Sequence, residues 1–359
     1  MTSTSLSYSI TETAGSSILE LERTPGTAAV SLSRAEELGD PPGSSPISAL
    51  IVQQIPGAQG MESPGSPYLD LYAKVVTSPR SVKNCPQFYV TAECVNGHRF
   101  AKKLVCGREY CPTCGADWSD SHQRRFARWL LKLQQLRTVG YFVFTMPEGI
   151  RDQYRTKAAL NELTKRITCG DKSKRMPGLL KDMGFSRGLC QWHWFGDGGP
   201  GYHPHLNVLV EAGYLGPELI DRIKSQYAEI LGVPMAVVNY SYAVDQGKMV
   251  HILKYVTRAT FRQYEWDDQL AEELYRFRSQ RCWGEWTGEP VWQLEGEPKF
   301  AHIEELEKGI CPECGKALRW GRPLPICLLP LEGPVDIGAG YYRLHDARPP
   351  PVDSHTLRV

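Results

Sequence analysis

The chain has 359 residues, with 41 Lys and Arg against 40 Asp and Glu, so its formal net charge is +1. This balance excludes a uniformly basic, histone-like protein but allows a local basic face. No stretch approaches the roughly 18 consecutive apolar residues of a membrane-spanning helix, and the first residues lack the pattern of a secretory signal. We therefore expect a cytoplasmic protein with no membrane partner, whose 11 cysteines are metal ligands or buried thiols rather than disulfides.

The first 80 residues have the composition of a disordered tail. They are rich in Ser, Thr, Pro and Gly, and up to Ser66 they contain seven acidic residues, two basic ones and no tryptophan. Such a segment cannot bury enough apolar surface to offset the entropy that is lost on ordering. We expect residues 1–80 to form a disordered acidic tail and residues 331–359 to form a loose C-terminal tail.

A cysteine-rich segment follows, and we assign residues 81–137 to a zinc-binding module with a basic helix. The turn Cys111-Pro-Thr-Cys114 presents two thiolates, and a second pair of ligands completes a tetrahedral zinc site. We favour Cys94 and Cys106 over His98 as that second pair, and Cys85 is a further alternative. The competing interpretation is a group of buried thiols without metal.

Residues 118–137 alternate apolar and basic side chains at helical spacing. From Arg99 to Arg137 the chain has nine basic and three acidic residues, so a neutral protein carries a basic module. The aromatic side chains of Trp118, Phe126 and Trp129 lie in the same stretch. Cations for phosphates and rings for base stacking predict an element that holds DNA, but an amphipathic helix packed on a sheet explains the same pattern.

Residues 138–295 alternate strand and helix patterns and form the expected catalytic domain. We predict strands over 139–147, 187–197, 202–214 and 235–244 and helices over 150–167, 216–231 and 245–264. The Gly/Pro-rich turn between the second and third strands predicts a hairpin. The whole pattern indicates an α+β fold with an antiparallel sheet.

His203 and His205 flank Pro204 inside an apolar strand. Alternate residues of a strand point to the same face, so the two imidazoles form half of a site for a divalent metal. On the preceding strand His193 and Gln191 also share a face, and the hairpin brings that face beside the pair. We choose His193 as the third ligand with Gln191 as the alternative. The competing interpretation is a pair of surface or hydrogen-bonded histidines.

The predicted helix over 245–264 carries a second candidate group. His251, Tyr255 and Arg258 have the spacing of one helical face. A tyrosine phenolate attacks phosphorus when a cation lowers its pKa and a metal polarises the phosphate. Arg258 and Lys254 are the candidate cations, and His251 is the candidate general base. The competing interpretation is an ordinary amphipathic helix with Tyr255 packed on the sheet.

A second CxxC turn, Cys311-Pro-Glu-Cys314, lies within residues 296–330. One such turn supplies half of a zinc site. Cys282 and Cys327 are the candidates that complete it, and a simple turn without metal is the alternative. Cys169 and Cys190 have no partner pattern, so we expect both to be core thiols.

The order of these motifs resembles that of the HUH endonucleases, which are the rolling-circle replication initiators of plasmids and phages and the related transposases. The motifs are a strand FVFTMP, then HPHLNVLV, then a helix with Lys-Tyr-x-x-Arg, and the resemblance covers about residues 85–290. It implies a ferredoxin- or RRM-like sheet with flanking helices, Mg²⁺ or Mn²⁺ at His203 and His205, and Tyr255 as the nucleophile. Arg258 stands where the family has lysine, and His251 stands where many single-tyrosine initiators have glutamate.

The reaction that the resemblance implies is a transesterification on single-stranded origin DNA, which leaves a 5′-phosphotyrosine and a free 3′-OH that primes replication. The sequence has no GxxxxGK[ST] motif, so a host helicase and polymerase are the expected partners. Single-strand transposases are the rival within the family, but they usually carry two tyrosines a few residues apart, and the next tyrosine here is Tyr264. A non-catalytic, zinc-dependent DNA-binding protein is the rival outside the enzymes.

Overall fold

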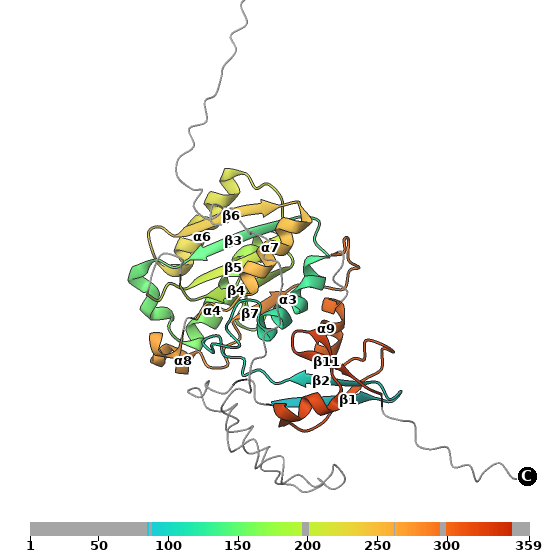
Figure 1. Ribbon diagram of the computed structural model, residues 1–359. Helices are drawn as coiled ribbons and strands as arrows, with labels where there is room; N and C mark the ends of the chain where they lie inside the picture. The colour runs from blue at the N-terminus through green and yellow to red at the C-terminus, as the bar shows by residue number, and fades with distance from the viewer. Residues whose placement is uncertain (1–84, 86–87, 196–200, 262, 295–298, 347–359) are drawn as a thin grey trace, which may run out of the picture. The chain divides into compact units, whose positions relative to one another are not determined.

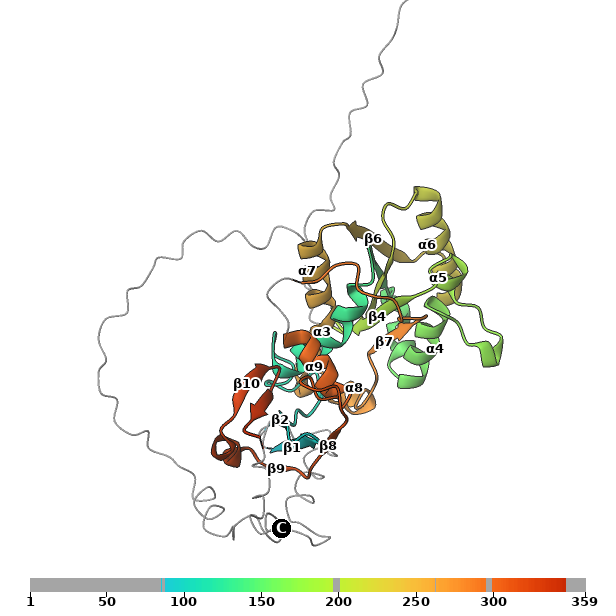
Figure 2. The same ribbon diagram turned by 90° about the vertical axis from the view of Figure 1, so that its right-hand side faces the viewer.

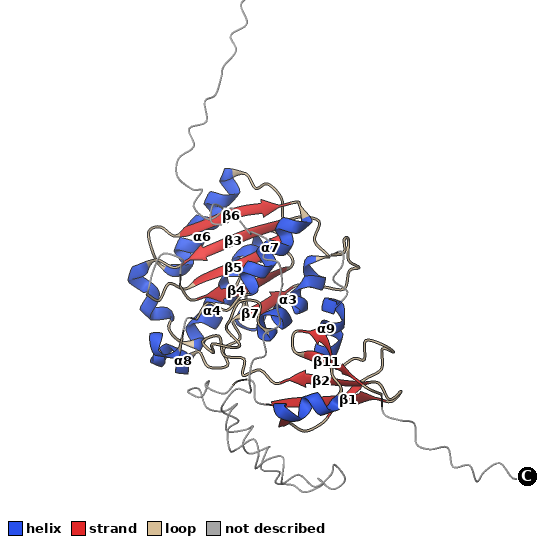
Figure 3. Cartoon of the chain, in the orientation of Figure 1, coloured by secondary structure: helices blue, strands red, loops and turns tan. Residues whose placement is uncertain are grey.

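The computed structural model describes residue 85 and residues 88–195, 201–261, 263–294 and 299–346 (Figure 1). Within them the chain forms an α+β fold with two antiparallel sheets and surrounding helices (Figure 3). This confirms the predicted α+β class with an antiparallel sheet. The tail predicted at residues 1–80 lies outside the described residues.

One sheet, here called the central sheet, has the strand order β6-β3-β5-β4-β7. Its strands are β3 (Val139–Thr145), β4 (Gly188–His193), β5 (His205–Glu211), β6 (Val237–Ala243) and β7 (Gln280–Trp283). All neighbouring strands are antiparallel. β4 and β5 pair as the predicted hairpin, with His193 opposite His205 and Gln191 opposite Asn207. The register therefore puts the candidate ligands of both strands on one face of the sheet.

Helices cover both faces of the central sheet (Figures 1 and 2). They are α3 (Asp120–Leu133), α4 (Lys157–Ile167), α6 (Pro217–Leu231) and α7 (Gln246–Thr257). α4 and α6 share a core with Phe142, Trp192 and Val208 on one face. α3 and α7 share a core with Leu189 and Leu209 on the other face. Side chains alternate along β4 and β5, so the candidate ligands lie on the face that α3 and α7 cover.

Local sequence explains where these helices begin and where one of them ends. The side chains of Ser119 and Asp245 cap the N-termini of α3 and α7 by accepting a hydrogen bond from a first-turn amide. α6 begins at Pro217 and ends at Leu231, directly before Gly232, whose φ of 68° favours glycine. α7 ends at Thr257, well before the predicted end at residue 264, because Arg258 has extended backbone.

The second sheet, here called the terminal sheet, combines segments from both ends of the described chain. Its strands are β1 (Phe88–Cys94), β2 (Arg99–Lys103), β8 (Leu318–Trp320), β9 (Leu324–Pro325), β10 (Val335–Gly338) and β11 (Tyr341–Leu344). The order is β10-β11-β2-β1-β8, and β9 also pairs with β1. Residues 331–346 are thus not the predicted loose tail, and the segment 296–330 is not a separate unit, because long-range strand pairing with β1 and β2 orders both.

A charged cluster joins the terminal sheet to α9 (Lys299–Glu307) and α3. The Glu307 carboxylate accepts hydrogen bonds from Lys102 Nζ at 2.9 Å and from the Tyr341 hydroxyl. Arg124, on α3, donates its Nε to Ala339 O at 2.8 Å. Side chains from α3, α9, β2 and β11 therefore meet at one buried place.

The remaining elements are short. They are η1 (Glu148–Tyr154), η2 (Lys172–Lys174), α5 (Leu179–Asp182), η3 (Tyr264–Trp266), α8 (Asp268–Glu273) and η4 (Ile326–Glu332). The helix predicted over 150–167 is divided into η1 and α4. Among the described residues, no helix combines the length and the apolar character needed to cross a bilayer.

Candidate functional site

Three histidines, His193, His205 and His203, are here called the histidine row. They lie next to one another and to Tyr255 on the α7 face of the central sheet. The ring centroid of Tyr255, on α7, lies 5.5 Å from that of His193 at the end of β4. The His193 ring lies 5.3 Å from that of His205 at the start of β5. The His205 ring lies 5.9 Å from that of His203. The structure therefore brings together the histidine pair, the favoured third ligand and the candidate nucleophile.

Hydrogen bonds to backbone carbonyls set the proton positions of two of these imidazoles. His193 Nε2 donates to Val256 O at 3.0 Å, so the lone pair is on Nδ1. His205 Nδ1 donates to His203 O at 3.1 Å, so the lone pair is on Nε2. Burial lowers the pKa of His193 well below its usual value, and His205 beside it acts in the same direction. A neutral imidazole oriented by a carbonyl is the form that binds metal ions.

Two polar atoms at this place are buried without a hydrogen-bond partner among the described residues. They are His203 Nε2 and Gln191 Oε1, and each can supply a lone pair to a divalent cation. Leaving a buried polar atom unsatisfied costs about 1–3 kcal/mol, so a bound cation removes an unfavourable term. His203 and Gln191 thus each present a buried acceptor atom without a hydrogen-bond partner among the described residues.

The ligand atoms of the histidine row are more widely spaced than those of the two cysteine clusters. Among the described residues, groups of three or more His, Cys, Asp and Glu with ligand atoms within 4.8 Å of one another occur at two places, and both are cysteine clusters. The three histidines are adjacent but do not reach that spacing. Catalytic groups are often loosely arranged until substrate binds.

The cations predicted beside Tyr255 have different positions. Arg258 follows the last residue of α7, so it is not on the predicted helical face, but its Cζ lies 4.2 Å from the Tyr255 ring centroid. Lys254 Nζ lies 4.8 Å from the ring centroid of Trp118 at the start of α3. His251 is exposed. Arg258 is therefore the cation in contact with the phenol ring, and Lys254 contacts Trp118 instead.

Side chains from α3 and β4 bind the carbonyls at the end of α7. The last carbonyls of a helix have no partner within the helix, and here four receive side-chain donors. The bonds are His122 Nε2 to Lys254 O (3.0 Å), His193 Nε2 to Val256 O (3.0 Å), Arg125 Nε to Thr257 O (2.8 Å) and Gln191 Nε2 to Arg258 O (2.9 Å). They end the helix at Thr257 and hold the turn that carries Tyr255.

Two of these donors, His122 and Arg125, were not predicted as site residues. His122 is fully buried, and burial, with Arg125 beside it, lowers the pKa of His122 to about 4, so it donates as a neutral imidazole. The two residues are three apart on α3 and so share a helical face. That spacing was the available signal, but the surrounding basic residues favoured a nucleic-acid surface instead.

The first cysteine cluster, here called the four-cysteine cluster, comprises Cys85, Cys106, Cys111 and Cys114, whose sulfur atoms lie within 4.8 Å of one another. Cys114 Sγ lies 3.3 Å from Cys85 Sγ and 3.6 Å from Cys106 Sγ. Sulfurs that share a tetrahedral zinc ion at about 2.3 Å lie roughly 3.8 Å apart. The four-cysteine cluster has the dimensions of a zinc site.

The second cluster, here called the cysteine–histidine cluster, comprises Cys94, His98, Cys311 and Cys314. Cys94 Sγ lies 3.7 Å from Cys314 Sγ, and Cys311 Sγ lies 3.5 Å from His98 Nδ1. The other ring nitrogen of His98 lies 3.4 Å from a carboxylate oxygen of Glu313. A carboxylate at that nitrogen is the usual device that orients a metal-binding imidazole. The cysteine–histidine cluster joins the β1–β2 hairpin to the turn before β8.

The division of ligands between the two clusters corrects the prediction. Cys94 and His98 were expected near Cys106, but the pairing of β1 with β8 carries them to the second CxxC turn. Cys85, named as an alternative, completes the first cluster. The sequence could not reveal this exchange because strand pairing across more than 200 residues leaves no local signal.

The other cysteines are not metal ligands in this arrangement. Cys282 and Cys327, expected to complete the second site, are exposed and belong to neither described cluster. Cys190 is buried in the core of the central sheet, as predicted, whereas Cys169 is only half-buried.

The predicted DNA-holding surface of α3 is largely turned into the protein. Phe126 and Trp129 are buried in the core that α3 shares with α7 and α9, so the packing interpretation holds for both rings. Trp118 is half-buried, and its ring lies 5.3 Å from that of Phe126. Of the three rings, only that of Trp118, just before α3, is partly exposed.

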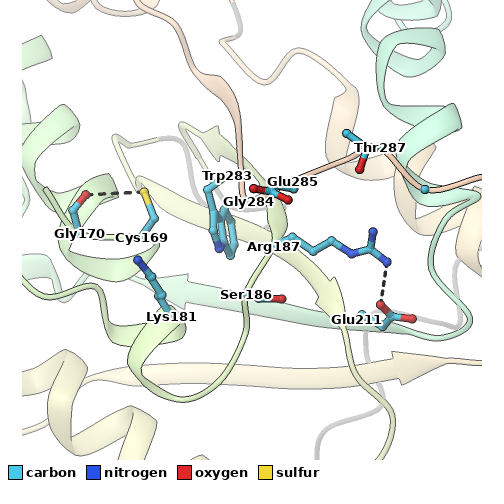
Figure 4. Close-up of a pocket in the computed structure, with 11 residues that line it drawn as sticks. Cys169, Gly170, Lys181, Ser186, Arg187, Glu211, Trp283, Gly284, Glu285 and Thr287 are labelled. Atoms are coloured by element: carbon cyan, nitrogen blue, oxygen red, sulfur yellow. Dashed lines mark hydrogen bonds and ion pairs between the residues drawn. The ribbon is translucent and has the colours of Figure 1, made fainter. Parts of the chain in front are cut away.

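A pocket of about 970 Å³ lies at the other end of β4 and β5 from the histidine row (Figure 4). Its lining includes Arg187, just before β4, Glu211, at the end of β5, and Trp283, at the end of β7. Arg187 forms an ion pair with Glu211 at 2.9 Å. These two charges are paired with each other, and the pocket is separate from the candidate site.

The site thus consists of a histidine row beside a tyrosine, with two cysteine clusters elsewhere in the chain. No family model, curated protein or solved structure matches the chain. Its function has to be inferred from the side chains themselves.

Proposed function

We propose that this protein is a rolling-circle replication initiator, an endonuclease of the HUH type that nicks single-stranded DNA with Tyr255. One observation carries the proposal: the ring of Tyr255 lies 5.5 Å from that of His193, which lies 5.3 Å from that of His205. A nucleophile for phosphorus beside a group of imidazoles is what metal-assisted phosphoryl transfer requires. The antiparallel sheet with helices on both faces is compatible with the HUH fold.

In this proposal His203 and His205 hold the catalytic Mg²⁺ or Mn²⁺, with His193 or Gln191 as the third ligand. The buried His203 Nε2, which has no hydrogen-bond partner among the described residues, supports the assignment, because a cation bound at His203 would satisfy this atom. Imidazole ligands favour Mn²⁺, since Mg²⁺ prefers oxygen. When bound, the cation polarises the scissile phosphate and offsets its developing negative charge.

Tyr255 Oη attacks the scissile phosphorus, and the bond from phosphorus to the 3′ oxygen breaks. The phenol proton passes to a base, for which we propose His251 one turn earlier on α7, and the departing 3′ oxygen takes up a proton. The guanidinium of Arg258, 4.2 Å from the phenol ring, favours the phenolate. Lys254 is a candidate for phosphate contact instead. The 5′-phosphotyrosine keeps the energy of the broken bond for rejoining the strand.

We also propose that each cysteine cluster holds one structural Zn²⁺. Four thiolates, or three thiolates with one imidazole, are the donor sets of closed zinc sites, and separations of 3.3–3.7 Å between ligand atoms support a shared ion in each. Elemental analysis of the purified chain should find two zinc ions. In the cytoplasm such a protein acts on single-stranded origin DNA and depends on a host helicase and polymerase for unwinding and synthesis.

The test of the nuclease is a covalent adduct. The full chain is incubated with Mn²⁺ and a pool of random single-stranded oligonucleotides labelled at the 3′ end, because the 5′-phosphotyrosine retains that end. We expect a labelled, SDS-resistant protein band that requires Mn²⁺ and is lost in Tyr255→Phe. Tyr264→Phe is the matched control and should keep the band. An adduct that persists in Tyr255→Phe, or no adduct with the unchanged chain, overturns the proposal.

One observation bears on the choice between initiator and transposase. Tyr264 lies outside α7 in η3, and its hydroxyl donates to Glu272 at 2.7 Å. It is therefore not a second tyrosine on the catalytic helix, which favours a single-tyrosine initiator. A non-catalytic zinc-dependent DNA-binding protein remains the outcome if the unchanged chain binds the oligonucleotides without forming the adduct.

A further inference from the structure

We infer that the four-cysteine cluster positions the nucleophile, because metal in this cluster fixes the side chains that hold the last turn of α7. The inference rests on the proposed function for its effect on cleavage, but its structural part does not. It makes His122, Arg125 and Glu109 positioning residues, which act on Tyr255 through the backbone around it.

The first connection runs from the cluster into the start of α3. Ser119, the cap of α3, donates its hydroxyl to the carbonyl of the ligand Cys114 at 2.9 Å. The Ser119 hydroxyl oxygen also accepts a hydrogen bond from the backbone amide of His122 at 3.3 Å. The cluster therefore sets the position and direction of the first turn of α3.

The second step runs from α3 to the end of α7. His122 Nε2 donates to Lys254 O at 3.0 Å, and Arg125 Nε donates to Thr257 O at 2.8 Å. These carbonyls flank Tyr255 on both sides in sequence. A positive guanidinium at the C-terminal end of a helix is also favourable to the helix dipole. A shift of α3 therefore moves the turn that carries the phenol.

A second connection leaves the cluster through Glu109, which lies between its ligands Cys106 and Cys111. The Glu109 carboxylate accepts hydrogen bonds from Trp194 Nε1 at 2.8 Å and from Ser279 Oγ at 2.9 Å. Thr260 Oγ1 in turn accepts the amide of Trp194 at 3.0 Å. Trp194 follows His193, and Thr260 lies two residues after Arg258, so Glu109 braces both segments that lead out of the site.

The cluster loop has little room to adapt while it makes these contacts. A Cβ placed on Gly115, directly after Cys114, would lie 1.9 Å from the carbonyl oxygen of Glu109. Tyr110 anchors this loop in the core of the central sheet, while an ion bound by the four cysteines would fix the backbone on both sides of it. Loss of the ion therefore releases Ser119 and Glu109 together, and the last turn of α7 loses donors on its α3 side.

The experiment compares amide hydrogen exchange of α7 in the full-length protein and in Cys114→Ser, Arg125→Ala and Arg125→Lys. We expect exchange at the end of α7 to be at least about 5-fold faster in Cys114→Ser and Arg125→Ala, with partial recovery in Arg125→Lys, which keeps a donor. Arg128→Ala on the same helix, where the side chain binds Glu307 instead, and Cys314→Ser in the other cluster are the controls with unchanged α7 exchange. Protected amides in the central sheet verify that each variant is folded.

The adduct assay adds a readout that general destabilisation does not move. At saturating oligonucleotide we expect adduct formation to be about 100-fold slower in Arg125→Ala, with a half-saturating DNA concentration close to that of the unchanged chain, since misplacement of a nucleophile acts on the chemical step. Unchanged α7 exchange in folded Cys114→Ser and Arg125→Ala overturns the inference, even if the unchanged chain cleaves DNA. If α7 exchange is faster in these variants but the unchanged chain forms no adduct, the positioning of α7 by the four-cysteine cluster is supported and the nuclease proposal is rejected.

Discussion

His193 contacts both the end of α7 and the other rings of the candidate site. Its Nε2 binds Val256 O and so helps to end α7, while its ring is next to those of His205 and Tyr255. A change at this residue therefore alters both the proposed metal site and the turn that carries Tyr255. Stability and metal affinity therefore have to be measured separately for the residues of the histidine row.

Replacing His193 with alanine should lower the free energy of unfolding by about 2–4 kcal/mol. The substitution leaves the carbonyl of the buried Val256 without this donor, which costs about 1–3 kcal/mol, and it opens a cavity in the interior. Urea denaturation measures the loss. His251→Ala, at an exposed site, should change stability by less than about 0.5 kcal/mol. Equal losses in the two variants would contradict the buried role of His193.

Replacing His203 with alanine should weaken Mn²⁺ binding at least about 10-fold with little loss of stability. The reason is that His203 Nε2 has no hydrogen-bond partner among the described residues, so the fold loses no bond of that atom. Electron paramagnetic resonance of unbound Mn²⁺ gives the affinity, and the same titration of Gln191→Leu against His193→Ala identifies the third ligand. An unchanged Mn²⁺ affinity in His203→Ala would show that the imidazole pair is only structural.

At the level of elements, hydrophobic patterning was enough to predict four of the five strands of the central sheet, but not its edge strand β7 or the end of α7. β3 to β6 and α6 follow from alternation and caps that are local in sequence. The end of α7 depends on His122 and Arg125 from α3 and on Gln191 and His193 from β4. Such donors come from distant segments, so a periodic pattern that continues to residue 264 overestimates the helix.

Charge patterning on α3 was misleading for a related reason. Arg124 binds Ala339 O, Arg125 binds Thr257 O and Arg128 binds Glu307. A count of basic residues does not reveal whether a cation faces solvent or a backbone carbonyl. The basic stretch therefore supplies internal braces as well as surface charge.

Replacing Arg124 with alanine should destabilise the protein by about 2–3 kcal/mol without changing the salt dependence of DNA binding. Arg124 is buried and donates to Ala339 O and Lys103 O at 2.8 and 2.9 Å. Lys132→Ala on the same helix should leave stability within about 0.5 kcal/mol of the unchanged chain. Urea denaturation and a salt titration of oligonucleotide binding check both parts. A reduced salt slope at unchanged stability would assign Arg124 to the DNA surface.

On the scale of the whole molecule, acid should weaken the cluster around Glu307. Burial raises the pKa of this carboxyl, but Lys102, Tyr341 and Arg124 outweigh burial and lower the pKa from 4.5 to about 2. A lowered pKa means that the ionised form stabilises the fold above pH 4.5, and that this stabilisation is lost as the pH falls towards 2. The shift of the Glu307 pKa from 4.5 to about 2 corresponds to a contribution of about 3 kcal/mol to the free energy of unfolding at neutral pH.

Glu307→Gln isolates that contribution. The variant should be less stable than the unchanged chain at neutral pH, and the difference between the two should shrink as the pH falls from 4.5 to 2. Acid also protonates the cysteines of the two clusters, but the resulting loss of stability is common to both proteins and cancels in the difference between their free energies of unfolding. Denaturation curves at several pH values provide the measurement. A difference that stays constant over this range would mean that Glu307 is not ionised in the fold.

The terminal sheet has a consequence for synthesis on the ribosome. Cys94 and His98 are translated more than 200 residues before their partners Cys311 and Cys314 and before the strand β11. A nascent polypeptide can complete the central sheet first, yet it holds an open edge on β2, and Cys94 and His98 lack their cluster partners, until residues 311–344 have been made. Prematurely terminated products keep that edge, which marks them for aggregation or degradation.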